Sequence, residues 1–232
     1  MKHIIIYITG LFLLFALNAC EENEDGYYDN IYRVYFPQDS INFSFGDKPD
    51  AIVRDTIYYP VKVLGLKVKQ EMKFKISVNA KETTAEANKH YVALQKEYPV
   101  LVDSVDAYIP IELIRSTLSE EEVSYKIVLN LETNGDFTTG IQESLRAVLT
   151  FNNYLEEPWW WSNMLGNYAP NYKPGMYRRM IAYYGKALDD EYINGNHYLE
   201  FMAVFKTQVY DYAQEHPELG WEFADGLWWP FD

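Results

Sequence analysis

Cys20 is the residue of this sequence with the clearest chemistry. It is the only cysteine in 232 residues, and it directly follows Leu17-Asn18-Ala19. The preceding residues 4–16 are almost wholly apolar, which is too short for a membrane span of about 20 residues but suits the core of a signal peptide. A small residue followed by cysteine at this point is typical of bacterial lipoprotein signals. We therefore expect residues 1–19 to be a lipoprotein signal peptide and Cys20 to be the lipidation site.

Lipidation at Cys20 predicts that the protein is anchored to membrane lipid. Two or more acyl chains hold firmly, because each buried methylene contributes about 0.8 kcal/mol. An uncleaved membrane anchor is the alternative. The next residues, 20–30, contain the run Glu21-Glu22-Asn23-Glu24-Asp25, which cannot bury itself and predicts a solvated acidic tether.

The tryptophans are the second group of residues with recognisable chemistry. Flat indole rings stack on the apolar faces of sugars while neighbouring carboxylates and amides bind the hydroxyls. Consecutive side chains cannot all point the same way, so at least one ring of the Trp triplet should be buried as a staple between two parts of the protein. An undocked pair near residue 229 would instead form an exposed apolar patch, which usually marks an interface. The candidate ligand or partner contacts are Trp159, Trp160, Trp161, Trp221, Trp228 and Trp229.

Metal and cofactor chemistry has little support in the sequence. The histidines after Cys20 are His90, His197 and His216, and none forms a His-Glu-x-x-His motif. We expect each to cap, to pack or to lie on the surface. The acidic runs 120–122 and 189–191 offer oxygen ligands for calcium, but neither has EF-hand spacing. Solvated charge is the better interpretation of both runs, and we expect no metal and no cofactor.

Catalytic motifs are equally scarce. The sequence has no Gly-x-Ser-x-Gly elbow and no phosphate-cradling glycine loop. A glycosidase needs two carboxylates at a fixed separation, and 34 Asp and Glu residues always offer some pair. We therefore expect a protein that is not an enzyme, with a surface glycan hydrolase or another carbohydrate-active enzyme as the alternative.

The composition argues against some classes of partner and chemistry. The formal net charge is −14, so the surface repels phosphate backbones and nucleic-acid binding is not expected. If Cys20 carries lipid, no thiol is left for a disulfide. Aromatic residues make up 17% of the chain, which favours well-packed structure over disorder.

Apolar residues recur at every second position through most of residues 32–151. In 123–132 they alternate with largely polar residues, Val128 included on the polar side, as expected of strands with one buried and one wet face. Such strands with turns between them predict an antiparallel immunoglobulin-like β-sandwich. Asn134-Gly135-Asp136 predicts a turn before the last strand, and residues 81–89 fit either a helical turn or a loop. The expected strands are 32–36, 52–63, 72–78, 99–102, 108–114, 123–132 and 145–151.

The period becomes helical after Pro158. A helix is expected over residues 175–188 with Pro174 near its first turn. A second helix is expected from Asn196, as its cap, to His216-Pro217. Its apolar stripe is Tyr198, Met202, Phe205, Val209 and Tyr212. The predicted fold is mainly β with a helical C-terminal part: a β-sandwich over residues 31–155, followed by a small, aromatic-rich α-helical domain over 156–232.

Several of these segments together resemble a family of Bacteroidetes surface lipoproteins catalogued as a domain of unknown function. They are the Cys20 junction with its acidic tether, residues 32–37, Phe43-Ser44-Phe45-Gly46 and Pro158-Trp159-Trp160-Trp161, and they span essentially the whole chain after Cys20. An acidic stretch after the lipidated cysteine resembles the signal for display on the outer face of the outer membrane; an ordinary linker facing the periplasm is the alternative. His90-Tyr91-Val92 and residues 108–111 also resemble Calx-beta and immunoglobulin-like sandwiches.

The resemblance implies a role in nutrient capture. Members of that family are typically encoded beside TonB-dependent transporters and their substrate-binding lipoproteins. We therefore expect a non-catalytic lipoprotein, anchored to outer-membrane lipid through Cys20 and exposed on the cell surface. It would bind a glycan or peptide, or serve as an accessory subunit of a TonB-dependent uptake system. A glycan binder predicts exposed aromatic rings in a concave surface rimmed by carboxylates and amides, whereas a subunit predicts a flat apolar patch of about 800 Å².

Overall fold

The computed structural model describes residues 31–140 and 142–231. Cys20, the signal peptide predicted for residues 1–19 and the tether predicted for 20–30 lie outside these residues. The described strands and helices belong to one unit, Tyr32–Asp232. Strands end at Asn152 and helices begin at Trp161, so the change of secondary structure falls where the sequence placed it. The division into two separate domains stays a prediction.

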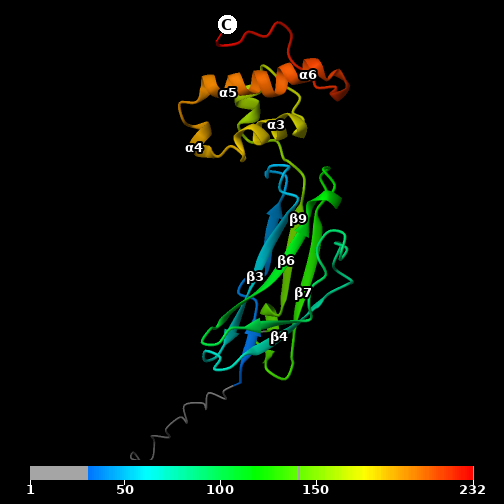
Figure 1. Cartoon of the computed structure of the whole chain (residues 1–232), viewed down its shortest axis with the longest axis vertical. Coiled ribbons are helices and arrows are strands. Elements are labelled where there is room, and N and C mark those ends of the chain that lie inside the picture. The colour runs from blue at the N-terminus through cyan, green and yellow to red at the C-terminus, as the bar shows by residue number, and fades with distance from the viewer. Residues whose placement is uncertain (1–30, 141, 232) are drawn as a thin grey trace, which may run out of the picture. The chain divides into compact units, whose positions relative to one another are not determined.

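Nine strands in the described residues form the two layers of a sandwich (Figure 1). The strand order is β6-β3-β1-β8 in one sheet and β2-β9-β7-β4-β5 in the other. The predicted immunoglobulin-like sandwich is confirmed, although β1–β8 and β2–β9 pair in parallel, so the sheets are mixed. The strands are β1 (Arg33–Tyr35), β2 (Ser40–Ser44), β3 (Arg54–Leu64), β4 (Met72–Val78), β5 (Glu97–Val100), β6 (Asp106–Ile114), β7 (Tyr125–Glu132), β8 (Thr138–Thr139) and β9 (Arg146–Asn152).

The alternation in the sequence becomes the core between the sheets. On β6, residues Ala107, Ile109, Ile111 and Leu113 are buried while the residues between them face outward, as a period of two requires. Tyr59 on the paired strand β3 is fully buried and donates its hydroxyl to the Gln38 carbonyl. Burial raises the pKa of Tyr59 to about 12, so the phenol stays neutral inside the core.

One strand departs from the expected pattern because a loop covers its outer face. Val128 falls on the predicted wet face of β7, yet it is fully buried and lies outside the cluster between the sheets. The backbone N–H of Val128 donates to Thr83 Oγ1 and its carbonyl accepts from the Asn79 N–H. Residues 81–89 are therefore a loop, which settles the alternative left open by the sequence.

The helices follow β9 (Figure 1). α3 begins at Pro174, one residue before the predicted Gly175. It ends at Tyr184, before the predicted Leu188, because Gly185 adopts a left-handed φ of 73°. No described helix is long and apolar enough to cross a membrane. The helical elements are α2 (Trp161–Leu165), α3 (Pro174–Tyr184), α4 (Asp190–Ile193), α5 (Tyr198–Phe205), the π-helical turn η3 (Lys206–Tyr210) and α6 (Asp211–Glu215), with short 3₁₀ turns η1 (Arg115–Thr117), η2 (Gln142–Ser144) and η4 (Pro217–Leu219).

α5, η3 and α6 together fill the second predicted helix. His216 closes it, as expected. The predicted cap at Asn196 is wrong: His197 occupies the N-cap position and makes no side-chain capping bond. The π turn was also not foreseen, because one wider turn leaves the spacing of the apolar stripe nearly unchanged.

Gly46 allows the turn after β2 to pass close to the chain that leaves β9. A Cβ at Gly46 would lie 1.9 Å from the Tyr154 carbonyl oxygen, whereas a Cβ at Gly135 would meet nothing within 4 Å. Gly135 sits in the predicted turn, where Asn134 Oδ1 accepts the N–H groups of Asp136 and Phe137.

We predict that Gly46→Ala lowers the free energy of unfolding by about 1–3 kcal/mol, because the backbone must move away from the added methyl group. Gly135→Ala is the matched control and should leave stability unchanged or raise it by up to about 1 kcal/mol. Urea unfolding of both variants measures the difference. Equal stabilities would contradict the close approach at Gly46.

Candidate functional site

The six candidate tryptophans divide into an exposed and a buried set. Trp159 and Trp228 are 59% and 67% exposed, whereas Trp160, Trp161 and Trp229 are buried. Trp221 is half-buried. The candidate contacts therefore do not form one platform, and only part of the predicted set can touch a ligand without rearrangement.

Trp160 and Trp161 form the centre of the helical core. The ring of Trp160 meets Tyr177 and Phe201 edge-on at centroid distances of 5.2 and 5.5 Å. Trp161 packs edge-on against Tyr172 at 4.9 Å and donates its Nε1–H to the Ala169 carbonyl. The triplet thus contains buried rings, as expected, but their ring partners all come from the helical segment, so they staple that segment to itself.

Trp228 lies at one side of a groove of about 410 Å³. Its neighbour Trp229 is buried against Tyr168 and Tyr210, each at 5.3 Å between ring centroids, which anchors the chain and leaves the Trp228 indole outside. The Tyr168 hydroxyl also donates to the Trp228 carbonyl at 3.1 Å. The aromatic and polar residues that line this Trp228 groove include Asn163, Asn167, Tyr198, Asp225 and Trp228.

The polar groups of the Trp228 groove suit sugar hydroxyls. Asn163 on α2, Asn167 just after it and Asp225 are exposed, so amide donors and acceptors lie beside a carboxylate. Tyr198 is 46% exposed and adds a second ring. Burial raises the pKa of Tyr168, and a hydrogen bond with Tyr198 raises it further. Its phenol therefore remains a neutral donor near pH 7.

Sequence reasoning missed four of the five groove residues. Tyr198 was assigned to the apolar stripe, but it stands at the exposed first turn of α5, while Met202, Phe205 and Val209 are buried as predicted. Asn163, Asn167 and Asp225 carried no motif. Their only signal is that they are uncharged amides or an acid near tryptophans, which many surface residues share.

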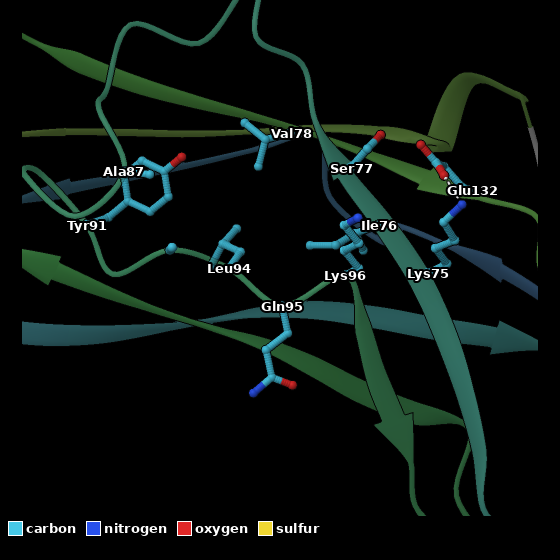
Figure 2. Close-up of a pocket in the computed structure, with 11 residues that line it drawn as sticks. Lys75, Ile76, Ser77, Val78, Ala87, Tyr91, Leu94, Gln95, Lys96 and Glu132 are labelled. Atoms are coloured by element: carbon cyan, nitrogen blue, oxygen red, sulfur yellow. Dashed lines mark ion pairs between the residues drawn. The ribbon is translucent and has the colours of Figure 1, made fainter.

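A second hollow, of about 480 Å³, opens on the sandwich (Figure 2). At one end Lys75 and Glu132 form an ion pair at 2.7 Å, and at the other Leu94 lies near Tyr91. The Tyr91 ring is buried, so no exposed aromatic face lines this hollow. It therefore lacks the stacking surface of the Trp228 groove.

His90, Asp189 and Asp190 serve local structure. His90 is buried and its Nδ1 accepts the Glu86 N–H, and burial lowers the pKa of its imidazole. Asp189 accepts the Tyr192 N–H as the N-cap of α4, while Asp190 accepts the Trp159 Nε1–H at 2.9 Å. Among the described residues no group of three or more metal-ligating side chains gathers.

The family assignment comes from residues 22–185, which match a family described as a domain of unknown function, DUF4843. The chain belongs to that family. The match includes Trp159, Trp160 and Trp161 but stops one residue after α3, so it is shorter than the resemblance expected across the whole chain after Cys20. Trp228 and the rest of its loop lie beyond it. No curated protein sequence matches the chain.

Several solved structures are similar to part of the chain. A candidate carbohydrate-binding protein from Bacteroides ovatus has 18% identity and a TM-score of 0.40 over 53% of this chain, and the chain spans only 38% of that protein. A protein of unknown function from the same organism has 15% identity and a TM-score of 0.41 over 55% of this chain and 46% of its own. The apo-form Calx CBD1 domain has 12% identity and a TM-score of 0.37 over 53% of this chain and 97% of its own.

We predict that Trp160→Ala lowers the free energy of unfolding by about 3–5 kcal/mol, because it empties the centre of the helical core. Trp159→Ala removes the adjacent, exposed ring and should cost less than about 1 kcal/mol. Thermal and urea unfolding of the two variants test this division. A larger loss for Trp159→Ala than for Trp160→Ala would overturn it.

Proposed function

We propose that the protein is a non-catalytic binding protein whose Trp228 groove takes up a glycan. The observation that carries this proposal is the pair of exposed rings, Trp228 and Tyr198, in a hollow lined by two amides and a carboxylate. This combination is the one expected for a saccharide, whose ring faces are apolar and whose edges carry hydroxyls.

The energetics of stacking support a saccharide. Covering about 100 Å² of exposed indole contributes about 2.5 kcal/mol at the usual value per unit of apolar area. Asn163, Asn167 and Asp225 can then hydrogen-bond the sugar edge without leaving a buried polar group unpaired. A peptide is the other ligand considered, but the groove offers no sheet edge or apolar pocket row to hold an extended chain.

A surface glycan hydrolase is the alternative function, and it would need two carboxyl groups held at a fixed separation across the bound sugar. Asp225 is the one carboxylate among the described residues that line the groove, so these residues do not supply such a pair, which favours binding over hydrolysis.

The cellular setting is part of the same proposal. We propose that Cys20 anchors the protein to outer-membrane lipid on the cell surface, where it serves as an accessory or ligand-binding component of a TonB-dependent uptake system. The resemblance to Bacteroidetes surface lipoproteins, whose members are typically encoded beside TonB-dependent transporters, supports this setting. The acidic surface, with its net charge of −14, suits a soluble body displayed on a tether.

We predict that Trp228→Ala weakens glycan binding about tenfold or more, because the lost stacking corresponds to about 1.5–2.5 kcal/mol. A glycan array with the soluble protein from residue 27 identifies the ligand, and calorimetry then measures Kd. Trp159→Ala is the matched control, because it removes an equally exposed indole that does not line the groove, and its Kd should be unchanged. Equal effects of the two substitutions would sink the assignment of the groove.

We predict that Cys20→Ala releases the protein from membranes without altering its fold, because only the lipid attachment is lost. Fractionation of cells that express each form tests the anchor, and a mutant that stayed in the membrane would refute it.

Purification of the lipidated protein in mild detergent, through a tag at Asp232, should recover a TonB-dependent transporter or its binding lipoprotein. Recovery of the protein alone would argue against the uptake complex but not against glycan binding.

A further inference from the structure

A third hollow, between the helical segment and the sandwich residues Asp50 and Glu120, contains arginines and aromatic rings. It has a volume of about 490 Å³, within the usual range of ligand sites, and it does not include any residue of the Trp228 groove. We refer to it as the Arg179 pocket. Its walls include Arg178, Arg179, Tyr183, Gln208, Tyr212 and Trp221.

The guanidinium of Arg179 is fixed on two sides and open on the third. Its central carbon lies 3.3 Å from the centroid of the Tyr212 ring, and its Nε–H donates to the Gln208 carbonyl. Gln208 belongs to the π turn η3, whose wider hydrogen-bonding pattern can leave carbonyls free for other donors. No described residue accepts from the two Nη atoms, which remain as a planar pair of donors.

The aromatic wall is built around a glycine. A Cβ at Gly175 would lie 2.8 Å from Cζ2 of Trp221, so the indole packs directly on the first turn of α3 only because that residue has no side chain. Tyr183, on the same helix, is 56% exposed. The pocket therefore offers an indole and a phenol ring beside the free edge of Arg179.

Carboxylates complete the lining and indicate the class of ligand. Asp50 and Glu120 both line the pocket, so it presents acceptors as well as donors. Asp50 is already paired with Arg115 and Arg178, so Glu120 is the carboxylate left to accept from a ligand. A sugar hydroxyl can accept from Arg179 and donate to Glu120, whereas an anion could use only the arginine and would meet the Glu120 charge. In addition, Arg178 Nε is buried with no partner among the described residues, an unmet donor of the kind that marks a missing water or ligand oxygen.

We propose that the Arg179 pocket is a second saccharide site, for a neutral sugar unit stacked on Trp221 and Tyr183 and hydrogen-bonded by Arg179 and Glu120. It deepens the proposed function and rests on it. The two sites have separate aromatic reporters, Trp228 in the groove and Trp221 in the pocket, so each can be tested without the other.

Fluorine NMR of the protein labelled with 5-fluorotryptophan separates the two sites. Each resonance is assigned by a single Trp→Phe substitution, and the labelled protein is titrated with cellohexaose, maltohexaose, mannohexaose, xylohexaose and an oligogalacturonate. We expect at least one neutral oligosaccharide to shift the Trp221 resonance as well as that of Trp228. Tyr183→Ala should abolish the Trp221 shift, while Tyr108→Ala, which removes an equally exposed ring on the sandwich, should leave it.

Each outcome decides one proposal. A Trp228 shift with an unmoved Trp221 resonance, at about 10 mM ligand where a site with a Kd of about 1 mM is nearly full, overturns the second site and leaves the groove assignment intact. A Trp221 shift without a Trp228 shift retains the pocket and removes the groove. If oligogalacturonate alone moved Trp221, the site would be one for acidic ligands and the assignment to neutral sugars would be wrong.

Discussion

Arg115 and Arg178 share the carboxylate of Asp50, and the path of the chain between sandwich and helices depends on this arrangement. The two guanidiniums lie 2.9 and 3.3 Å from Asp50 Oδ1, and both arginine side chains are at least nine-tenths buried. Burial lowers the pKa of Arg115, and the Asp50 charge opposes that shift. A desolvated guanidinium is costly unless its N–H groups are bonded, so the chain around it must supply acceptors.

Those acceptors come from the segments that the arginines connect. Arg115 donates to the Pro49 and Ile52 carbonyls and to Asn153 Oδ1, while Arg178 donates to the Asn153 carbonyl at 2.8 Å. The loop before β3, the end of β9 and the middle of α3 are thereby fixed to one another. Because Asp50 itself is largely exposed, its Coulomb attraction is screened, and the oriented carbonyls carry much of the constraint.

The strands could be predicted from the sequence because burial and period coincide in them. On β6 and β9 every second residue enters the core, so a period of two suffices. Val128 does not follow this period because a loop distant in the sequence covers it, and such a tertiary contact leaves no periodic pattern in the sequence. The helical segment was predicted in outline for the same reason, since Met202, Phe205 and Val209 keep their spacing through the π turn. The shared role of Asp50 could not be foreseen, because it joins residues 50, 115 and 178, which no local pattern relates.

The same limit explains why the tryptophans were identified but not sorted. The sequence shows where each indole lies along the chain. Whether that ring is buried depends on which side chains pack against it in the folded protein. Trp229 packs beside Tyr168, and its neighbour Trp228 therefore faces outward. Trp160 packs against Tyr177, which lies on α3, the helix that Arg178 holds in place. The fixed position of α3 also sets Arg179 opposite η3. The aromatic rings that do not fit into this core lie at the surface. The polar and charged side chains beside them then determine which ligands those surfaces can bind.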